Sequence, residues 1–67
     1  MEKILESRMR EILKENGDYV RNGTGFNLLL RVQRDPIINI DIVFRFADMY
    51  GVSIDYLLGR SDFYGYF

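Results

Sequence analysis

Three arginines lie in a stretch of the chain that contains no acidic residue. Arg21, Arg31 and Arg34 fall within residues 19–34, whereas the parts of the chain on either side contain more acidic than basic residues. A guanidinium group neutralises a phosphate and hydrogen-bonds to it, and an acid-free segment does not repel a phosphate backbone. The pattern makes residues 19–34 the candidate nucleic-acid-facing part of the chain, while three arginines in such a window are also typical of an ordinary solvated surface.

The chain lacks the residue types most used for catalysis and metal binding. It contains no His and no Cys, so it has no imidazole to act as a general base or ligand and no thiolate. Its carboxylates are scattered along helix faces and form no catalytic constellation. We expect no enzyme activity, no metal site and no cofactor.

Length and composition predict one small domain over residues 1–67. Hydrophobic residues make up 48% of the chain, which is enough for a compact core, and the net charge of −1 is not that of a strong nucleic-acid binder. No apolar run approaches the roughly 18 residues of a membrane span, and the charged N-terminal segment is unlike a signal peptide. We therefore expect a cytoplasmic protein without a membrane partner.

Apolar spacing and capping residues predict three helices, near residues 3–16, 39–50 and 53–58. In each, apolar side chains recur at steps of three and four residues. Asn39 and Ser53 are suited to cap helix N-termini, and Gly17 and Gly51 to end helices. The first helix has an apolar stripe of Ile4, Leu5, Met9, Ile12 and Leu13. The predicted core consists of Leu5, Met9, Ile12, Leu13, Val43, Phe46, Ala47, Val52, Leu57 and Leu58.

The middle of the chain has two competing interpretations. Asn22-Gly23 is a strong hairpin signal, and after it Phe26, Leu28 and Leu30 alternate with other residues as in a strand. A short helix pair across residues 19–34 is the other possibility. The fold class is therefore mainly α, a small helical bundle, with a β-hairpin as the alternative for this segment.

Two segments resemble the Cro/CI-type, or XRE-family, helix-turn-helix domain. The sequence NIDIVFRFADMYGVSIDYLLGRSD (residues 39–62) is similar to the last two helices of that family, and SRMREILKENG (residues 7–17) is similar to its first helix. The resemblance covers roughly the first 17 and the last 29 residues. It implies a five-helix, lambda-repressor-like domain of a small transcription regulator, common in bacteria and phages.

The resemblance also implies where DNA would bind. The recognition helix would span residues 24–33 and expose Gly25, Phe26, Asn27 and Leu30, of which only Asn27 is a good reader of base edges. The family's second helix is replaced by the short DYVRNG (residues 18–23), which lacks that helix's Gln and Leu-Ala. The candidate DNA-binding residues are Arg21, Asn22, Thr24, Asn27, Arg31, Gln33 and Arg34.

Two functions follow from these patterns. The first is a sequence-specific transcriptional regulator that binds double-stranded DNA as a homodimer. The second is a phage-type inhibitor or antirepressor that binds a protein partner, for example a host defence nuclease, on a degenerate helix-turn-helix scaffold. The aromatic C-terminal segment favours the second function, or simply folds back over a small core. The partner-binding residues would be Phe26, Leu30, Phe63, Tyr64, Tyr66 and Phe67.

Overall fold

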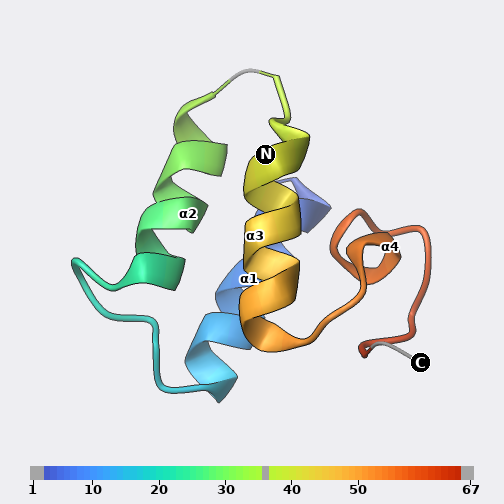
Figure 1. Cartoon of the computed structure of the whole chain (residues 1–67), viewed down its shortest axis with the longest axis horizontal. Helices are drawn as coiled ribbons and strands as arrows, with labels where there is room; N and C mark the ends of the chain where they lie inside the picture. Colours follow the sequence, from blue (N-terminus) through green and yellow to red (C-terminus); the bar gives the residue numbers. More distant parts are fainter. Residues whose placement is uncertain (1–2, 36, 66–67) are drawn as a thin grey trace.

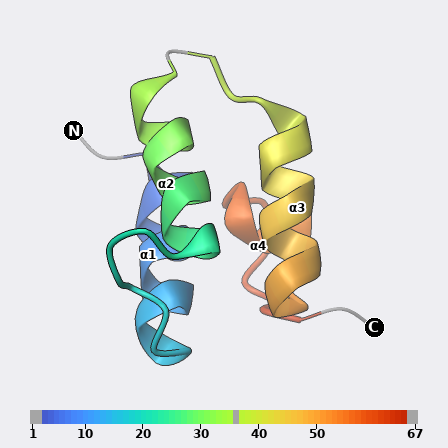
Figure 2. The same ribbon diagram turned by 60° about the vertical axis from the view of Figure 1, so that its left-hand side comes forward.

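The computed structural model describes residues 3–35 and 37–65, which form four helices and no β-strand. The helices are α1 (Ile4–Glu15), α2 (Thr24–Arg34), α3 (Ile40–Tyr50) and α4 (Ile54–Leu57). α1 packs against α2 and α4, and α3 packs against the same two helices from the other side. α2 and α4 therefore lie at opposite sides of the bundle (Figure 1). Figure 2 shows α2 and α3 side by side, joined at one end.

The three helices predicted from spacing and caps are confirmed as α1, α3 and α4. The Asn39 side chain accepts a hydrogen bond from the N–H of Asp41 at 3.0 Å, and the Ser53 side chain accepts one from the N–H of Tyr56 at 3.0 Å. Gly51 ends α3 in the left-handed conformation, with a φ of 63°. The predicted caps thus form as hydrogen bonds, which satisfy helix-end groups that would otherwise lack a partner.

The β-hairpin alternative for the middle segment is wrong, because this segment contains α2. Leu28, Leu29 and Val32 form a buried stripe with helical spacing. In a strand, neighbouring side chains point to opposite faces, so Leu29 would lie on the solvent side when Leu28 is buried. Asn22 does take the positive φ, 69°, that a tight turn requires, but the turn leads into a helix instead of a second strand. Burial of the leucine stripe outweighs the local hairpin signal.

The part of the chain between Glu15 and Thr24 forms turns and no helix. The described residues therefore contain four helices instead of the five that the family resemblance implies, and instead of a helix pair, residues 19–34 contain one helix. Residues 16–23 reverse the chain direction directly, so α1 and α2 pack as neighbours (Figure 2).

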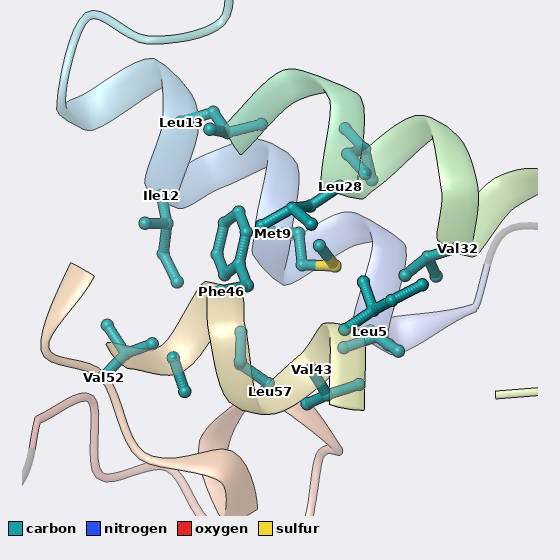
Figure 3. Packing of buried hydrophobic residues seen from close by; sticks show 13 residues of the cluster. Leu5, Met9, Ile12, Leu13, Leu28, Val32, Val43, Phe46, Val52 and Leu57 are labelled. Atoms are coloured by element: carbon teal, nitrogen blue, oxygen red, sulfur yellow. The ribbon is translucent and has the colours of Figure 1, made fainter. Parts of the chain in front are cut away.

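The core lies between α1, α2 and α3 and is closed by α4. Phe46 is its largest fully buried residue, and it points from α3 towards Met9 and Ile12 of α1 (Figure 3). Nine of the ten predicted core residues are buried, and Leu58 is partly buried against them. Ile4, expected on the apolar stripe, is 49% exposed. The core members that the predicted list lacked are Leu28, Leu29, Val32 and Ile42.

The segment after α4 folds back onto α1 and α4. The Arg8 guanidinium donates hydrogen bonds to the carbonyl oxygens of Tyr56 and Ser61 and lies 4.2 Å from the centre of the Tyr56 ring. The Tyr64 hydroxyl donates to Glu15 Oε1 at 2.7 Å, and the Tyr64 ring packs on that of Tyr56. Tyr64 thus folds back onto the helices, as the sequence allowed for the aromatic C-terminal segment, whereas the side chain of Phe63 is 64% exposed.

Candidate nucleic-acid interface

α2 has one buried side and one solvent-facing side. Gly25, Leu28, Leu29 and Val32 are buried, and they occupy one side of the helix at 3.6 residues per turn. The opposite side carries four exposed residues, which we call the α2 stripe. Its members are Asn27, Leu30, Arg31 and Arg34. The stripe runs along two full turns of the helix, because its residues are spaced at three and four positions.

The α2 stripe is positively charged. α2 contains no acidic residue, and Arg31 and Arg34 are in no ion pair within residues 3–35 and 37–65. The nearest acidic residue along the chain is Asp35, at the C-cap of the helix. The two guanidinium groups therefore face solvent with their hydrogen-bond donors open to an anion, and Asn27 lies one turn before Arg31.

Three further candidate DNA-binding residues lie at the start of α2. Arg21 and Asn22 are exposed in the turn before the helix, and Thr24 is exposed at its first position. The N-cap of α2 is Gly23, and no side chain caps the helix there. Uncapped N–H groups and the helix dipole favour an anion at such an end. These residues therefore extend the positive surface beyond the α2 stripe towards the preceding turn.

Gln33 is exposed but does not belong to the same surface. It lies about 100° around the helix from Arg34, on the side of Phe26. The structure thus brings together Asn27, Arg31 and Arg34 and leaves Gln33 on the flank.

Gly25 is buried, so the expectation that it is exposed on a recognition helix is wrong. A Cβ at this position would collide with the Tyr50 hydroxyl and would lie 2.7 Å from Leu13 Cδ2. The backbone of α2 therefore approaches the end of α3 more closely than a residue with a side chain allows. Because Gly25 is on the side of α2 that faces the core, the α2 stripe on the opposite side faces solvent.

Tyr50 also fixes the turn before α2. Its hydroxyl donates a hydrogen bond to Asp18 Oδ2 at 2.9 Å, which links the end of α3 to residues 16–23. Burial and this hydrogen bond, together with the negative charge of Asp18, raise the pKa of Tyr50 to about 12. The tyrosine therefore remains a proton donor over the physiological pH range.

An aromatic pair borders the α2 stripe. The Tyr19 ring meets the Phe26 ring edge-on with 5.4 Å between their centres, and Lys14 Nζ lies 5.5 Å from the centre of the Tyr19 ring. Phe26 is half-buried, whereas Leu30 is 38% exposed. Tyr19 lies in the acid-free residues 19–34 but is not among the DNA-binding or partner-binding residues predicted from the sequence. Its position seven residues before Phe26, in an unassigned turn, gave no periodic signal.

The residues of the alternative, protein-binding site do not form one surface. Phe26 and Leu30 belong to α2, whereas Phe63 and Tyr64 follow α4 on the far side of the bundle (Figure 1). Tyr66 and Phe67 lie outside the described residues. Of the described residues of that predicted site, only Leu30 belongs to the α2 stripe and only Phe26 lies beside it.

Within residues 3–35 and 37–65, no group of three or more carboxylates is placed to hold a metal ion, and no helix has the length and hydropathy needed to cross a bilayer. No protein-family model matches the chain, and neither a curated protein nor a solved structure matches it significantly.

Proposed function

We propose that this protein is a sequence-specific, DNA-binding transcriptional regulator of bacterial or phage type that presents α2 to double-stranded DNA. In this proposal the fold is a lambda-repressor-like bundle in which turns replace the second helix. The resemblance of residues 7–17 and 39–62 to the XRE family supports it, and so does the presence of a helix, α2, where that resemblance predicts the recognition helix.

The observation that carries the proposal is the charge and exposure of the α2 stripe. Arg31 and Arg34 project from a helix without acidic residues, and Asn27 precedes Arg31 by one turn on the same side. Arginines placed in this way neutralise phosphates, and an exposed Asn on a helix in the major groove can bond to adenine. One helix therefore combines phosphate-positioning groups with one base-reading group.

The direct test is equilibrium binding to DNA from upstream of the protein's own gene, measured at several salt concentrations. Binding should weaken linearly in log K against log salt, because phosphate contacts release counterions. Asn27→Ala should cost about 1–3 kcal/mol at one base pair and relax the preference there. Absence of binding at low salt, or binding without salt dependence, would overturn the proposal.

A second candidate function is supported by the apolar residues on and beside the α2 stripe. Leu30 is exposed between Asn27 and Arg34, and the Tyr19–Phe26 pair lies next to it. Arginine and tyrosine, which border Leu30 here, are enriched in protein-interface hot spots. On this basis the alternative is an inhibitor or antirepressor that docks α2 onto a protein partner.

The two functions respond differently to single substitutions on the α2 stripe. For a DNA-binding regulator, Arg31→Ala should weaken binding and Leu30→Ala should have little effect. For a protein-binding inhibitor, Leu30→Ala should abolish activity, and Arg31→Ala should leave most of it. Both positions are exposed, so neither substitution is expected to change stability by more than about 0.5 kcal/mol.

A further inference from the structure

Exposed apolar side chains gather on α3 and on the segment that leads into it. Among the large apolar residues, Ile37 is 79% exposed, Phe44 50%, Met49 47%, Ile40 46% and Ile38 44%. Ile40 and Phe44 lie one turn apart on the same edge of α3, and exposed apolar surface of this kind marks an interaction site in a small protein. These apolar residues lie on α3 and directly before it, whereas the proposed DNA contacts lie on α2 and in the turn before α2.

The outward side of α3 combines these apolar residues with charged ones. Ile42, Val43, Phe46 and Ala47 are buried, and the opposite side, which we call the α3 face, is exposed. The α3 face consists of Ile40, Asp41, Phe44, Arg45, Asp48 and Met49. At about 100° per residue, Ile40 and Phe44 lie along one edge, and Asp41 and Arg45 lie towards the other.

We propose that the α3 face is the interface with a second copy of this chain, in which the two α3 helices pack antiparallel about a two-fold axis that crosses the helix at the level of residue 43. Such an axis pairs residues that are equally far from its centre, so Asp41 of each copy meets Arg45 of the other. Arg45 is in no ion pair in the described part of one chain. At Asp41 and Arg45 the α3 face is thus complementary in charge to itself.

The same register matches the apolar residues. Because the two-fold axis keeps each edge on its own side, Ile40 and Phe44 of one copy lie along Ile40 and Phe44 of the other. Met49 lies on the other edge, about 180° around the helix from Ile40, and Ile37 lies before the helix begins. Ile37 borders an open hollow of about 400 Å³ whose lining residues are Asp35, Ile37, Ile38 and Asn39. One register therefore pairs Asp41 with Arg45 and sets the Ile40–Phe44 edges of the two copies against each other, and Asp48 lies outside these pairs.

The expected dimer is weak. α3 has 11 residues and so spans only about 16 Å, which gives an interface at the lower end of the specific size range. A dissociation constant on the order of 10 µM is consistent with such an interface. The proposal does not rest on DNA binding, because it uses only the α3 face and its own charges.

The test is sedimentation equilibrium of the full chain at concentrations up to 1 mM, with two charge-reversed variants. The unmodified chain should dimerise. Asp41→Arg and Arg45→Asp each place like charges opposite one another, and each should weaken self-association at least about tenfold. An equimolar mixture of the two variants restores opposite charges at both contacts, and it should form a heterodimer with about the original affinity.

Arg60→Asp is the control, because it reverses one charge on an exposed residue outside the α3 face and should leave the dimer unchanged. Circular dichroism shows whether each variant keeps its helices. A chain that stays monomeric at 1 mM contradicts the proposal. Folded single variants that dimerise as well as the parent, or that fail to associate when mixed, contradict the antiparallel register.

Discussion

Gly25 lies directly against the hydroxyl group of Tyr50, with no room for a Cβ atom between them. The contact joins the first turn of α2 to the last residue of α3 at the point where Tyr50 also holds Asp18 of the preceding turn. Gly25 is therefore not a flexible site on a recognition helix. It is the position where two helices and a turn come together, and it sets the direction in which the α2 stripe faces.

Gly25→Ala should destabilise the protein. The added methyl group displaces Tyr50 and Leu13, which costs about 1–3 kcal/mol in a packed site. Replacing glycine by alanine within a helix recovers up to about 1 kcal/mol, so the net change in the free energy of unfolding is a loss. Urea denaturation followed by circular dichroism measures it.

The control for this substitution is Tyr50→Phe, which removes the atom nearest to the new methyl group. In the Tyr50→Phe background, Gly25→Ala should cost less than in the parent, because only the contact with Leu13 remains too close, and the two effects should not add. Equal destabilisation in both backgrounds would show that the collision with the Tyr50 hydroxyl is not the cause.

Phe46→Ala should unfold the domain or come close to it. Phe46 is fully buried between α1 and α3, and truncating a buried aromatic side chain costs about 3–5 kcal/mol. Phe44→Ala is the matched control, because Phe44 lies two residues earlier on the same helix and is 50% exposed. Thermal denaturation should separate the two variants clearly, and similar melting temperatures would refute the assignment of the buried side of α3.

Stability should fall at alkaline pH because two tyrosines hydrogen-bond to carboxylates. Burial and the bond to Asp18 raise the pKa of Tyr50 to about 12, and burial and the bond to Glu15 raise the pKa of Tyr64 to about 12. The unfolded chain releases these protons near pH 10, so the stabilisation is complete below pH 10 and is lost as pH rises towards 12.

The corresponding measurement is urea denaturation between pH 8 and pH 12. The parent should lose stability across this range, and the Tyr50→Phe/Tyr64→Phe variant should show a smaller slope. Identical slopes would mean that these two hydroxyl groups are not linked to folding.

Arg8→Lys should release the segment that follows α4. Lysine keeps the positive charge but lacks the planar guanidinium group that packs on the Tyr56 ring while its Nη1 donates to the Tyr56 and Ser61 carbonyl oxygens. The N–H of Ser53, which donates to Tyr64 O at 3.1 Å, should then exchange with solvent roughly tenfold faster. Asp62→Asn is the control: Asp62 is fully exposed and its 3.4 Å pair with Arg8 adds little, so exchange should not change.

The sequence was most informative where local rules and burial agree. Asn39, Gly51 and Ser53 define the ends of α3 and α4 by hydrogen bonds and backbone angles that depend on single residues, so those ends were predicted closely. Phe46 and Val43 follow from helical spacing in the same way. These features need no knowledge of distant parts of the chain.

The middle segment was ambiguous because its outcome depends on tertiary contacts. Asn22-Gly23 favours a hairpin locally, and only burial of Leu28, Leu29 and Val32 against other helices decides for α2. The burial of Gly25 depends on Tyr50, which lies 25 residues later in the sequence. For the candidate site, residue types and charge were predictable, whereas the separation of Gln33 from Asn27, Arg31 and Arg34 required the helix itself.

The decisive measurement is the salt dependence of DNA binding by the Arg31→Ala/Arg34→Ala variant. If the α2 stripe binds the phosphate backbone, removing both arginines should weaken binding to all sequences alike and flatten the slope of log K against log salt by roughly two units. Arg60→Ala, which removes an exposed arginine after α4, should leave the slope unchanged. A double variant that binds DNA with the parent's affinity and slope would contradict DNA binding through the α2 stripe.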